Sequence, residues 1–220
     1  AAALAIVAAS TPLAAQDSTA ALRSFARAAR TYRTAKSVQA TFTQTLTNPR
    51  TGSSTTARGS FAQRGVRRFA FRFTEPAGEA IVADGEALWV YLPSSMKGQV
   101  LKLPPGSPMG LDAIVAVLTD PGGQFVAKEL GADTTVARSA SRFELTPRPG
   151  KATSFARAWV WVDTRRATLV QFETEELGGI RRRVRFDRIR FNEAVADGVL
   201  RFVPPAGVRI VDQAAMLRPD

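Results

Sequence analysis

The chain has 220 residues but contains no cysteine and no histidine. Their absence excludes disulfide bonds, thiol nucleophiles and imidazole bases, and it removes the usual protein ligands of zinc, copper and haem. An enzyme built from this sequence would have to use carboxylates, hydroxyls, lysine or tyrosine alone. Three carboxylates lie close together at Glu173, Glu175 and Glu176, but nothing in the sequence positions a substrate beside them. We therefore expect no catalysis, no metal and no cofactor.

The sequence also lacks an apolar run long enough to span a membrane, which takes roughly 20 residues. The apolar run over residues 1–15 is uncharged and ends in small residues. This pattern is typical of the later part of a secretory signal peptide, and it predicts cleavage near Ala15. Residues 16–220 are then expected to form a single exported domain. Because no cysteine follows the run, we expect a soluble protein without a lipid anchor.

Lysine is scarce, so arginine supplies most of the 30 basic residues and of the formal net charge of +11. This excess has two interpretations: a generally arginine-rich composition, or docking on acidic partners or anionic lipid. The arginines of residues 181–190 leave the same choice between a solvated face and a partner-docking patch. Nucleic acid is not favoured, because the sequence has no recognisable binding motif.

Hydrophobic periodicity predicts two helices and many strands. Apolar residues at helical spacing indicate a helix over residues 18–36 and a short amphipathic helix over residues 110–119. Alternation bounded by glycine, proline and aspartate predicts strands over residues 38–46, 58–64, 67–74, 78–83, 87–92, 99–103, 134–139, 141–147, 154–163, 168–176, 180–191 and 199–204. Such spacing favours one antiparallel barrel or deeply curved sheet. Within 180–191 the alternation breaks, which predicts either a bulge near Asp187 or a strand end that is buried on both sides.

The richest stretch is the aromatic strand of Phe69, Phe71 and Phe73, whose spacing of two places three rings on one face. An Asp84-Gly85 turn follows between two strand patterns and predicts a hairpin. A face this aromatic must lie against something apolar, which is either an ordinary core or a bound ligand. Trp89 and Tyr91 fall on the other face of their strand, so we expect them to pack outside, under the N-terminal helix.

Several segments, in this order, resemble the periplasmic outer-membrane lipoprotein carrier (LolA) family over about residues 20–212. They are ATFTQ at 40–44, GSFAQR at 59–64, FAFRFTEP at 69–76, VADGEALWVY at 82–91, LTP at 145–147, RFN at 190–192 and LRFVPPAGV at 200–208. The family normally has proline after the arginine that ends the second segment, whereas here Gly65 follows Arg64.

The resemblance implies a mainly β fold, a half-open antiparallel β-barrel of about 11 strands. Its hydrophobic cavity would be closed by the N-terminal helix and the short internal helix. The acyl-chain cavity would be lined by Phe42, Phe61, Phe69, Phe71, Phe73, Leu88 and Val90. Arg64 would latch the lid to the barrel, and the lid helix would use Leu111, Ile114, Val115 and Leu118.

The function that this resemblance implies is that of a periplasmic carrier. A monomer would accept acylated lipoproteins from an inner-membrane ABC transporter of the Lol type and pass them to an outer-membrane receptor lipoprotein. Three alternatives remain at this stage: a carrier of another lipid or amphiphile, a lipoprotein-sensing regulatory domain, and a carboxylate-based hydrolase. A solvent-filled cleft with paired acids would favour the last.

Overall fold

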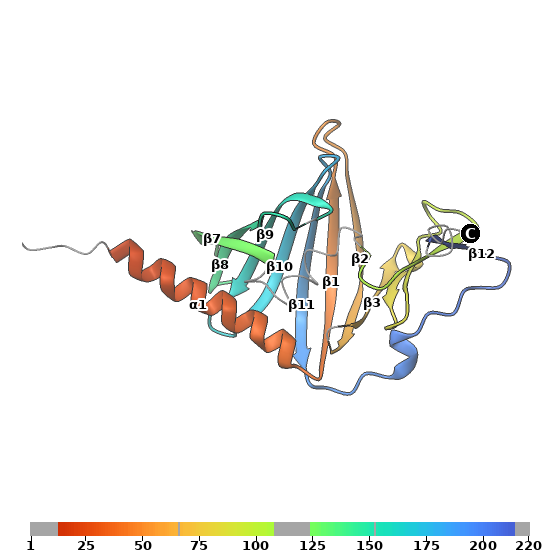
Figure 1. The fold of residues 1–220 in the computed structure, drawn as a ribbon, viewed down its shortest axis with the longest axis horizontal. Helices are drawn as coiled ribbons and strands as arrows, with labels where there is room; N and C mark the ends of the chain where they lie inside the picture. Colours follow the sequence, from red (N-terminus) through yellow and green to blue (C-terminus); the bar gives the residue numbers. More distant parts are fainter. Residues whose placement is uncertain (1–12, 66, 108–123, 152, 214–220) are drawn as a thin grey trace, which may run out of the picture.

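The computed structural model describes residues 13–65, 67–107, 124–151 and 153–213 (Figure 1). Within them lie one α-helix, one short 3-10 helix and a single 12-stranded sheet. The elements are α1 (Leu13–Thr34), β1 (Ser37–Thr47), β2 (Ser54–Arg64), β3 (Arg68–Glu75), β4 (Ala77–Ala83), β5 (Leu88–Tyr91), β6 (Gln99–Leu103), β7 (Phe125–Ala132), β8 (Ala140–Pro147), β9 (Phe155–Asp163), β10 (Thr168–Glu176), β11 (Arg181–Phe191), η1 (Asp197–Leu200) and β12 (Arg209–Asp212).

The sheet consists of two meanders joined by the first strand. Its order is β12-β6-β5-β4-β3-β2-β1-β11-β10-β9-β8-β7, so β1 stands in the middle, between β2 and β11 (Figure 1). Neighbours pair antiparallel except at one edge, where β12 runs parallel to β6. The prediction of a mainly β, antiparallel, open barrel-like sheet is confirmed, with 12 strands instead of about 11.

The sheet is strongly curled. Strands β3 and β11 are separated by β2 and β1, so in a flat sheet their side chains would lie roughly 14 Å apart. The ring centroids of Phe71 on β3 and Phe186 on β11 are only 6.4 Å apart. The face that carries these rings is therefore concave, and we call it the inner face. The opposite surface is the outer face.

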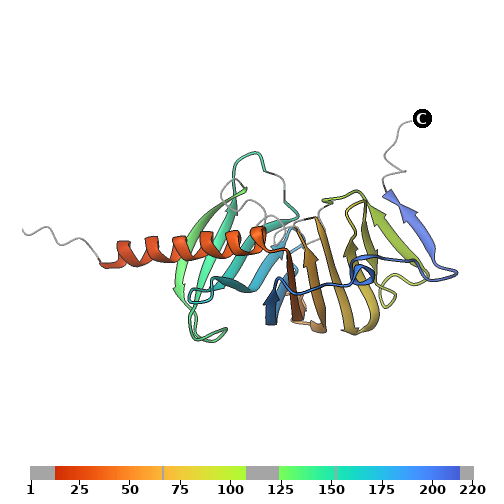
Figure 2. The ribbon, with the colours of Figure 1, turned by 90° about the horizontal axis from the view of Figure 1, so that it is seen from below.

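Helix α1 lies across one end of the curled sheet, beside β7, β9 and β10 (Figure 2). Its buried stripe includes Phe25, Ala28 and Tyr32, at the spacing expected of an amphipathic helix. The Phe25 ring lies 5.3 Å from that of Phe143, and the buried Tyr32 hydroxyl donates to the Leu169 carbonyl at 2.9 Å. The predicted helix is confirmed, although it begins at Leu13 and ends at Thr34.

The outer face of β2–β5 is covered by the segment after β11. Val195 and Leu200 of this segment pack on small residues of the strands, namely Ala62, Ala70, Ala80 and Val82. We call residues 193–202, which include η1, the strap. The strap, rather than the N-terminal helix, covers Trp89 and Tyr91: their rings lie 5.6 and 5.8 Å from Phe202. The expectation that α1 would cover them was wrong, because the chain returns across this face after β11.

Two predicted strands are wrong, and two strands were not predicted. Residues 134–139 form turns instead of a strand, because the Asp133 carboxylate accepts from the backbone and hydroxyl of Thr135. The strand before them, β7, was missed. Residues 199–204 are the end of η1 and an extended segment, and the last strand is β12 further on.

Of the two interpretations of residues 180–191, the bulge is confirmed. Pairing between β1 and β11 shifts register between Gln39 and Thr41, opposite Arg190 and Asp187, and Arg188 there has a φ of 52°. The predicted helix over residues 110–119 lies outside the described residues. No helix in the described ranges is both long enough and apolar enough to cross a membrane.

Candidate functional site: the aromatic inner face

Phe71 is the centre of a cluster of phenyl rings on the inner face. Its centroid lies 5.1 Å from that of Phe42, 4.9 Å from Phe61, 6.1 Å from Phe69 and 6.4 Å from Phe186. Edge-on and tilted arrangements dominate, as aromatic pairs prefer. Phe71 is 2 % exposed, so its ring is shielded from solvent in this structure.

Strand alternation and register place these rings together. Phe61 is paired directly with Phe71 across β2 and β3, and Phe42 with Phe186 across β1 and β11. Gly59 pairs with both Phe42 and Phe73, whose rings are 5.2 Å apart. A Cβ atom at Gly59 would lie 2.9 Å from Cε1 of Phe42 and 2.1 Å from the Arg72 carbonyl oxygen. A side chain here would thus displace a ring and part of the backbone of β3.

The structure brings all seven predicted cavity residues into one hydrophobic cluster. Phe69 is half-buried, and the other six are buried: Phe42, Phe61, Phe71, Phe73, Leu88 and Val90. Their use for acyl chains stays a prediction. Phe172 and Phe186, whose ring centroids are 6.3 Å apart, also belong to this cluster but were not predicted as cavity residues. The sequence did show that Val184 and Phe186 share one face of their strand. It did not show that β11 pairs with β1, which places that face beside the other rings.

Arg64, the predicted latch, points to the outer face. Its guanidinium donates to the carboxylate of Asp197 and to the carbonyl of Val195, both in the strap. Gly65 has a φ of 58°, a value that the ring of a proline cannot adopt, so this turn differs from one with the family's proline. The four lid-helix residues, Leu111, Ile114, Val115 and Leu118, lie outside the described residues. The latch therefore stays a prediction.

The inner face becomes polar at the end opposite α1. Arg182 donates from Nε to Oε1 of Glu176 at 3.0 Å and from Nη1 to Oε1 of Gln44 at 3.0 Å. Thr174, the direct cross-strand partner of Arg182, is 0 % exposed, and its hydroxyl has no hydrogen-bond partner among the residues that the structure describes. Gln44 is also buried, whereas Arg182 and Glu176 are half-buried. We call Gln44, Thr174, Glu176 and Arg182 the polar rim.

The carboxylates that suggested acid–base chemistry are all engaged by arginines. Glu173 accepts from Arg183 at 2.7 Å, and Glu175 is paired with both Arg157 and Arg181. Glu173 and Glu175 lie on the outer face, whereas Glu176 belongs to the polar rim. In the described part of the chain no group of three or more acidic residues could hold a metal ion.

The outer face is held by directional polar contacts. The Arg72 guanidinium donates to three strap carbonyls: Val199 at 3.0 Å, Gly198 at 3.2 Å and Arg201 at 2.7 Å. Guanidinium donors in a planar fork suit such convergent acceptors. These bonds fasten the strap to β3.

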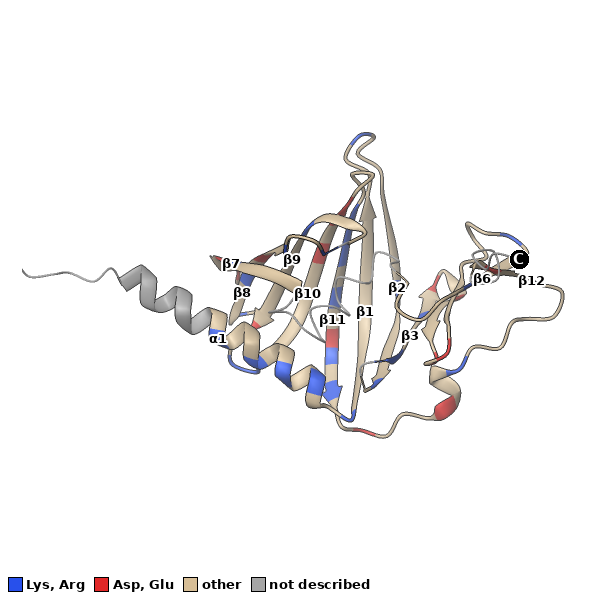
Figure 3. Ribbon diagram, viewed as in Figure 1, with Lys and Arg blue, Asp and Glu red and all other residues tan. Residues whose placement is uncertain are grey.

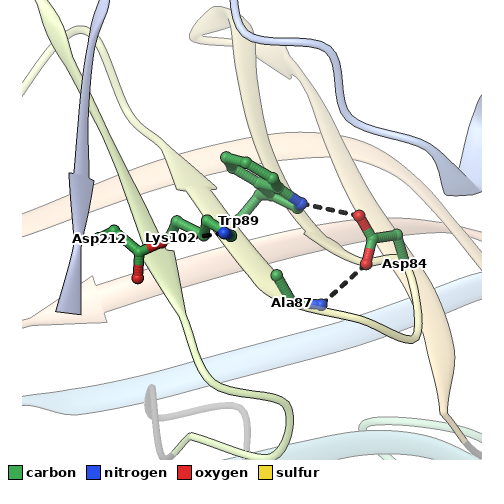
Figure 4. A network of polar contacts seen from close by, with 5 residues as sticks. All are labelled: Asp84, Ala87, Trp89, Lys102 and Asp212. Atoms are coloured by element: carbon green, nitrogen blue, oxygen red, sulfur yellow. Dashed lines mark hydrogen bonds and ion pairs between the residues drawn. The ribbon is translucent and has the colours of Figure 1, made fainter. Parts of the chain in front are cut away.

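A second network stands where β12 joins the sheet (Figure 4). Asp84 accepts from the Trp89 indole at 2.7 Å and from the backbone of Glu86 and Ala87 at 2.9 Å each. Burial acts to raise the pKa of Asp84, but these hydrogen bonds outweigh it and hold the pKa below its usual value. Lys102 lies over the Trp89 ring and pairs with Asp212 at 2.9 Å, which ties β12 to β6.

The fold and this face define a class of protein: an open, curled antiparallel sheet that presents an aromatic concave surface next to helix α1. Comparison with known proteins gives the family. The model for "Outer membrane lipoprotein carrier protein LolA" matches residues 33–203, and the chain belongs to this family.

Two curated relatives agree with that assignment, and one solved structure has the same fold. An outer-membrane lipoprotein carrier protein of Leptothrix cholodnii is 30% identical over 199 residues, covering 90% of this chain and 86% of the relative. One of Methylibium petroleiphilum is 29% identical, covering 81% and 84%. An uncharacterized conserved protein from Thermus thermophilus shares the fold with a TM-score of 0.52 at 14% identity, covering 87% of this chain and 98% of that one.

Proposed function

We propose that this protein is a periplasmic carrier that holds the acyl chains of lipoproteins against its inner face. It would receive them from an inner-membrane ABC transporter and release them to a receptor at the outer membrane. The observation that carries the proposal is the concave cluster of phenyl rings around Phe71, in a chain of the lipoprotein carrier family. It would work as a soluble carrier without covalent chemistry.

The binding energy expected for acyl chains suits a carrier that must release its cargo. Each buried methylene contributes about 0.8 kcal/mol, so one long acyl chain contributes roughly 10 kcal/mol. Several chains buried in full would exceed the ~20 kcal/mol ceiling of non-covalent affinity. In the structure the rings already contact one another, so an acyl chain exchanges ring–ring contacts for ring–chain contacts. The net gain is therefore smaller than the transfer from water.

The experiment uses spheroplasts that express the matching transporter, to which the purified protein is added. We expect outer-membrane lipoproteins to appear in the soluble fraction as a complex with the protein. Phe71→Glu places a charge in the ring cluster and should abolish release. Val203→Glu, at a residue 70% exposed, adds the same charge on the surface and should leave release unchanged.

Circular dichroism shows whether both variants are folded. If Phe71→Glu is unfolded, Phe71→Leu is the milder substitution to use in its place. Folded wild-type protein that releases nothing beside an active transporter would contradict lipoprotein carriage. A soluble complex with other lipids alone would instead indicate a carrier of another amphiphile.

A further inference from the structure

We infer that the polar rim binds the uncharged, carbonyl-bearing head of an acylated cargo, so that the site selects acyl groups beside an uncharged head over the same acyl groups beside an anionic one. The inference rests on the proposed function and deepens it. The reason is the position of the rim on the same face as the rings. Along β1 the inner-face position after Phe42 is Gln44, and along β10 the one after Phe172 is Thr174.

The rim stands at the opposite end of the inner face from α1. Tyr32 of α1 bonds to Leu169 near the start of β10, whereas Thr174 and Glu176 are near its end (Figure 1). Acyl chains lying along the rings toward α1 would leave their polar junction at the rim. Thr174 is the inner-face position directly after Phe172, and Glu176 is the next one. Because the polar side chains follow the last ring without a gap, the rim suits a short polar head that is attached directly to the acyl chains.

The rim has unused hydrogen-bonding capacity. Among the described residues, the bonds to Glu176 and Gln44 use three of the five N–H groups of Arg182 and leave two. The buried Thr174 hydroxyl has no partner in the same part of the chain, although buried polar groups are nearly always hydrogen-bonded. A carbonyl oxygen can accept from both of these donors, and an amide N–H can donate to the oxygens of Glu176 or Gln44.

The charge balance of the rim decides between ligand classes. Arg182 is paired with Glu176 at 2.9 Å, so the rim carries no net charge of its own. A phosphate or free carboxylate would have to displace Glu176 or lie beside it, and like charges in a half-buried site repel. Basic residues are spread along β11 (Figure 3). The two residues next to Arg182 in the chain, Arg181 and Arg183, form ion pairs with acidic residues on the outer face.

The test compares three probes by fluorescence titration: an acylated, glyceryl-ester lipopeptide, phosphatidylglycerol with the same chains, and diphenylhexatriene, a hydrocarbon without polar atoms. Wild type should bind the lipopeptide more tightly than the phospholipid. Arg182→Met should weaken lipopeptide binding about tenfold or more, the range of a lost charged hydrogen bond, and leave diphenylhexatriene binding within about twofold. Arg183→Met, next in the chain but on the outer face, should change neither.

Thr174→Val keeps the argument testable if Arg182→Met is unstable. Removing an unpaired buried hydroxyl should raise the melting temperature of the free protein while weakening lipopeptide binding severalfold, a combination that a purely structural role does not produce. Equal loss for lipopeptide and hydrocarbon in Arg182→Met, or equal wild-type affinity for phospholipid and lipopeptide, would overturn the inference. If wild type binds neither lipopeptide nor hydrocarbon, the proposed function itself fails.

Discussion

The two faces of the sheet are held by different forces. The inner face is a cluster of rings such as Phe42, Phe61 and Phe71, whose contacts are non-directional. The outer face of β2–β5 has small apolar residues under Val195 and Leu200 of the strap and two aromatic residues, Trp89 and Tyr91, beside Phe202. Arg72 binds the strap through defined backbone carbonyls. Non-directional contacts can be exchanged for those of a flexible acyl chain, whereas convergent hydrogen bonds require one partner in one geometry. If the proposed function holds, the same sheet would combine a surface whose contacts can be exchanged with one whose contacts are permanent.

The largest test of this contrast replaces one core residue on each face. Phe71→Ala and Leu200→Ala, both at nearly inaccessible sites, should lower the free energy of unfolding by about 3–5 and 2–5 kcal/mol respectively. Urea unfolding measures both. Added lipopeptide should still raise the melting temperature of Leu200→Ala as in wild type, but raise that of Phe71→Ala less. Equal ligand shifts in the two variants would remove the distinction between the faces.

The arginine bonds of the outer face give the next effect. Arg72→Met keeps the apolar stem but leaves the carbonyls of Gly198, Val199 and Arg201 without this donor, so we expect a loss of about 2–3 kcal/mol. The strap should also become sensitive to limited proteolysis. Arg58→Met, which removes an exposed ion pair with Glu75, is the matched control and should cost less than about 1 kcal/mol. Cleavage no faster in Arg72→Met than in the control would show that the arginine does not hold the strap.

A smaller effect is expected where the inner face meets α1. Tyr32→Phe removes the buried hydrogen bond to the Leu169 carbonyl while keeping the ring, so the loss should be about 1–2 kcal/mol. Burial also raises the pKa of the Tyr32 hydroxyl far above its usual value, so the phenol stays protonated at neutral pH. Thermal unfolding of the two proteins checks the figure. An unchanged melting temperature would mean that the Tyr32 hydrogen bond does not help to hold the helix.

The smallest effect is the acid dependence of the Asp84 network. The pKa of Asp84 is lower in the folded protein than in the unfolded chain, so its contribution is present above the unfolded pKa of about 3.9 and is lost as pH falls through the folded value. Asp84→Asn should lower stability slightly at neutral pH and flatten the decline below about pH 4. Melting curves from neutral to strongly acidic pH record this. If the melting temperatures of the variant and the wild type fall in parallel below about pH 4, Asp84 does not contribute to the acid dependence of stability.

Much of this architecture was predictable, and the misses have physical causes. Apolar residues at every second position made β1 and β3 visible, and the aromatic spacing at Phe69, Phe71 and Phe73 correctly placed these rings on one face. β7 was missed because its apolar residues fall on both faces: Phe125 is buried in the core, whereas Val126 and Leu130 are exposed, so the sequence there does not alternate between apolar and polar residues. A strand was predicted in the strap because Val199 and Leu200 lie among apolar residues. In the structure the carbonyl of Val199 accepts a hydrogen bond from the Arg72 side chain instead of from a neighbouring strand.

The polar rim could not be predicted, because it depends on which strands are neighbours. Gln44 and Arg182 are 138 residues apart in sequence, and nothing local to either position indicates the other. Phe186 is a similar case: its alternation was recognisable, but its place beside Phe61 follows from the pairing of β1 with β11. Long-range register, rather than local pattern, was the missing information.

The central position of β1 has a consequence for how the chain reaches this structure. Strands β2 to β6 and β7 to β11 are hairpin meanders, whose contacts are close in sequence and can form early. The pairing of β1 with β11 joins residues 38–47 to residues 181–191 and closes the largest loop in the sheet. We expect the pairing of β1 with β11 to limit the folding rate. Since the ring cluster spans it, the inner face would be complete only when the last long-range contact has formed.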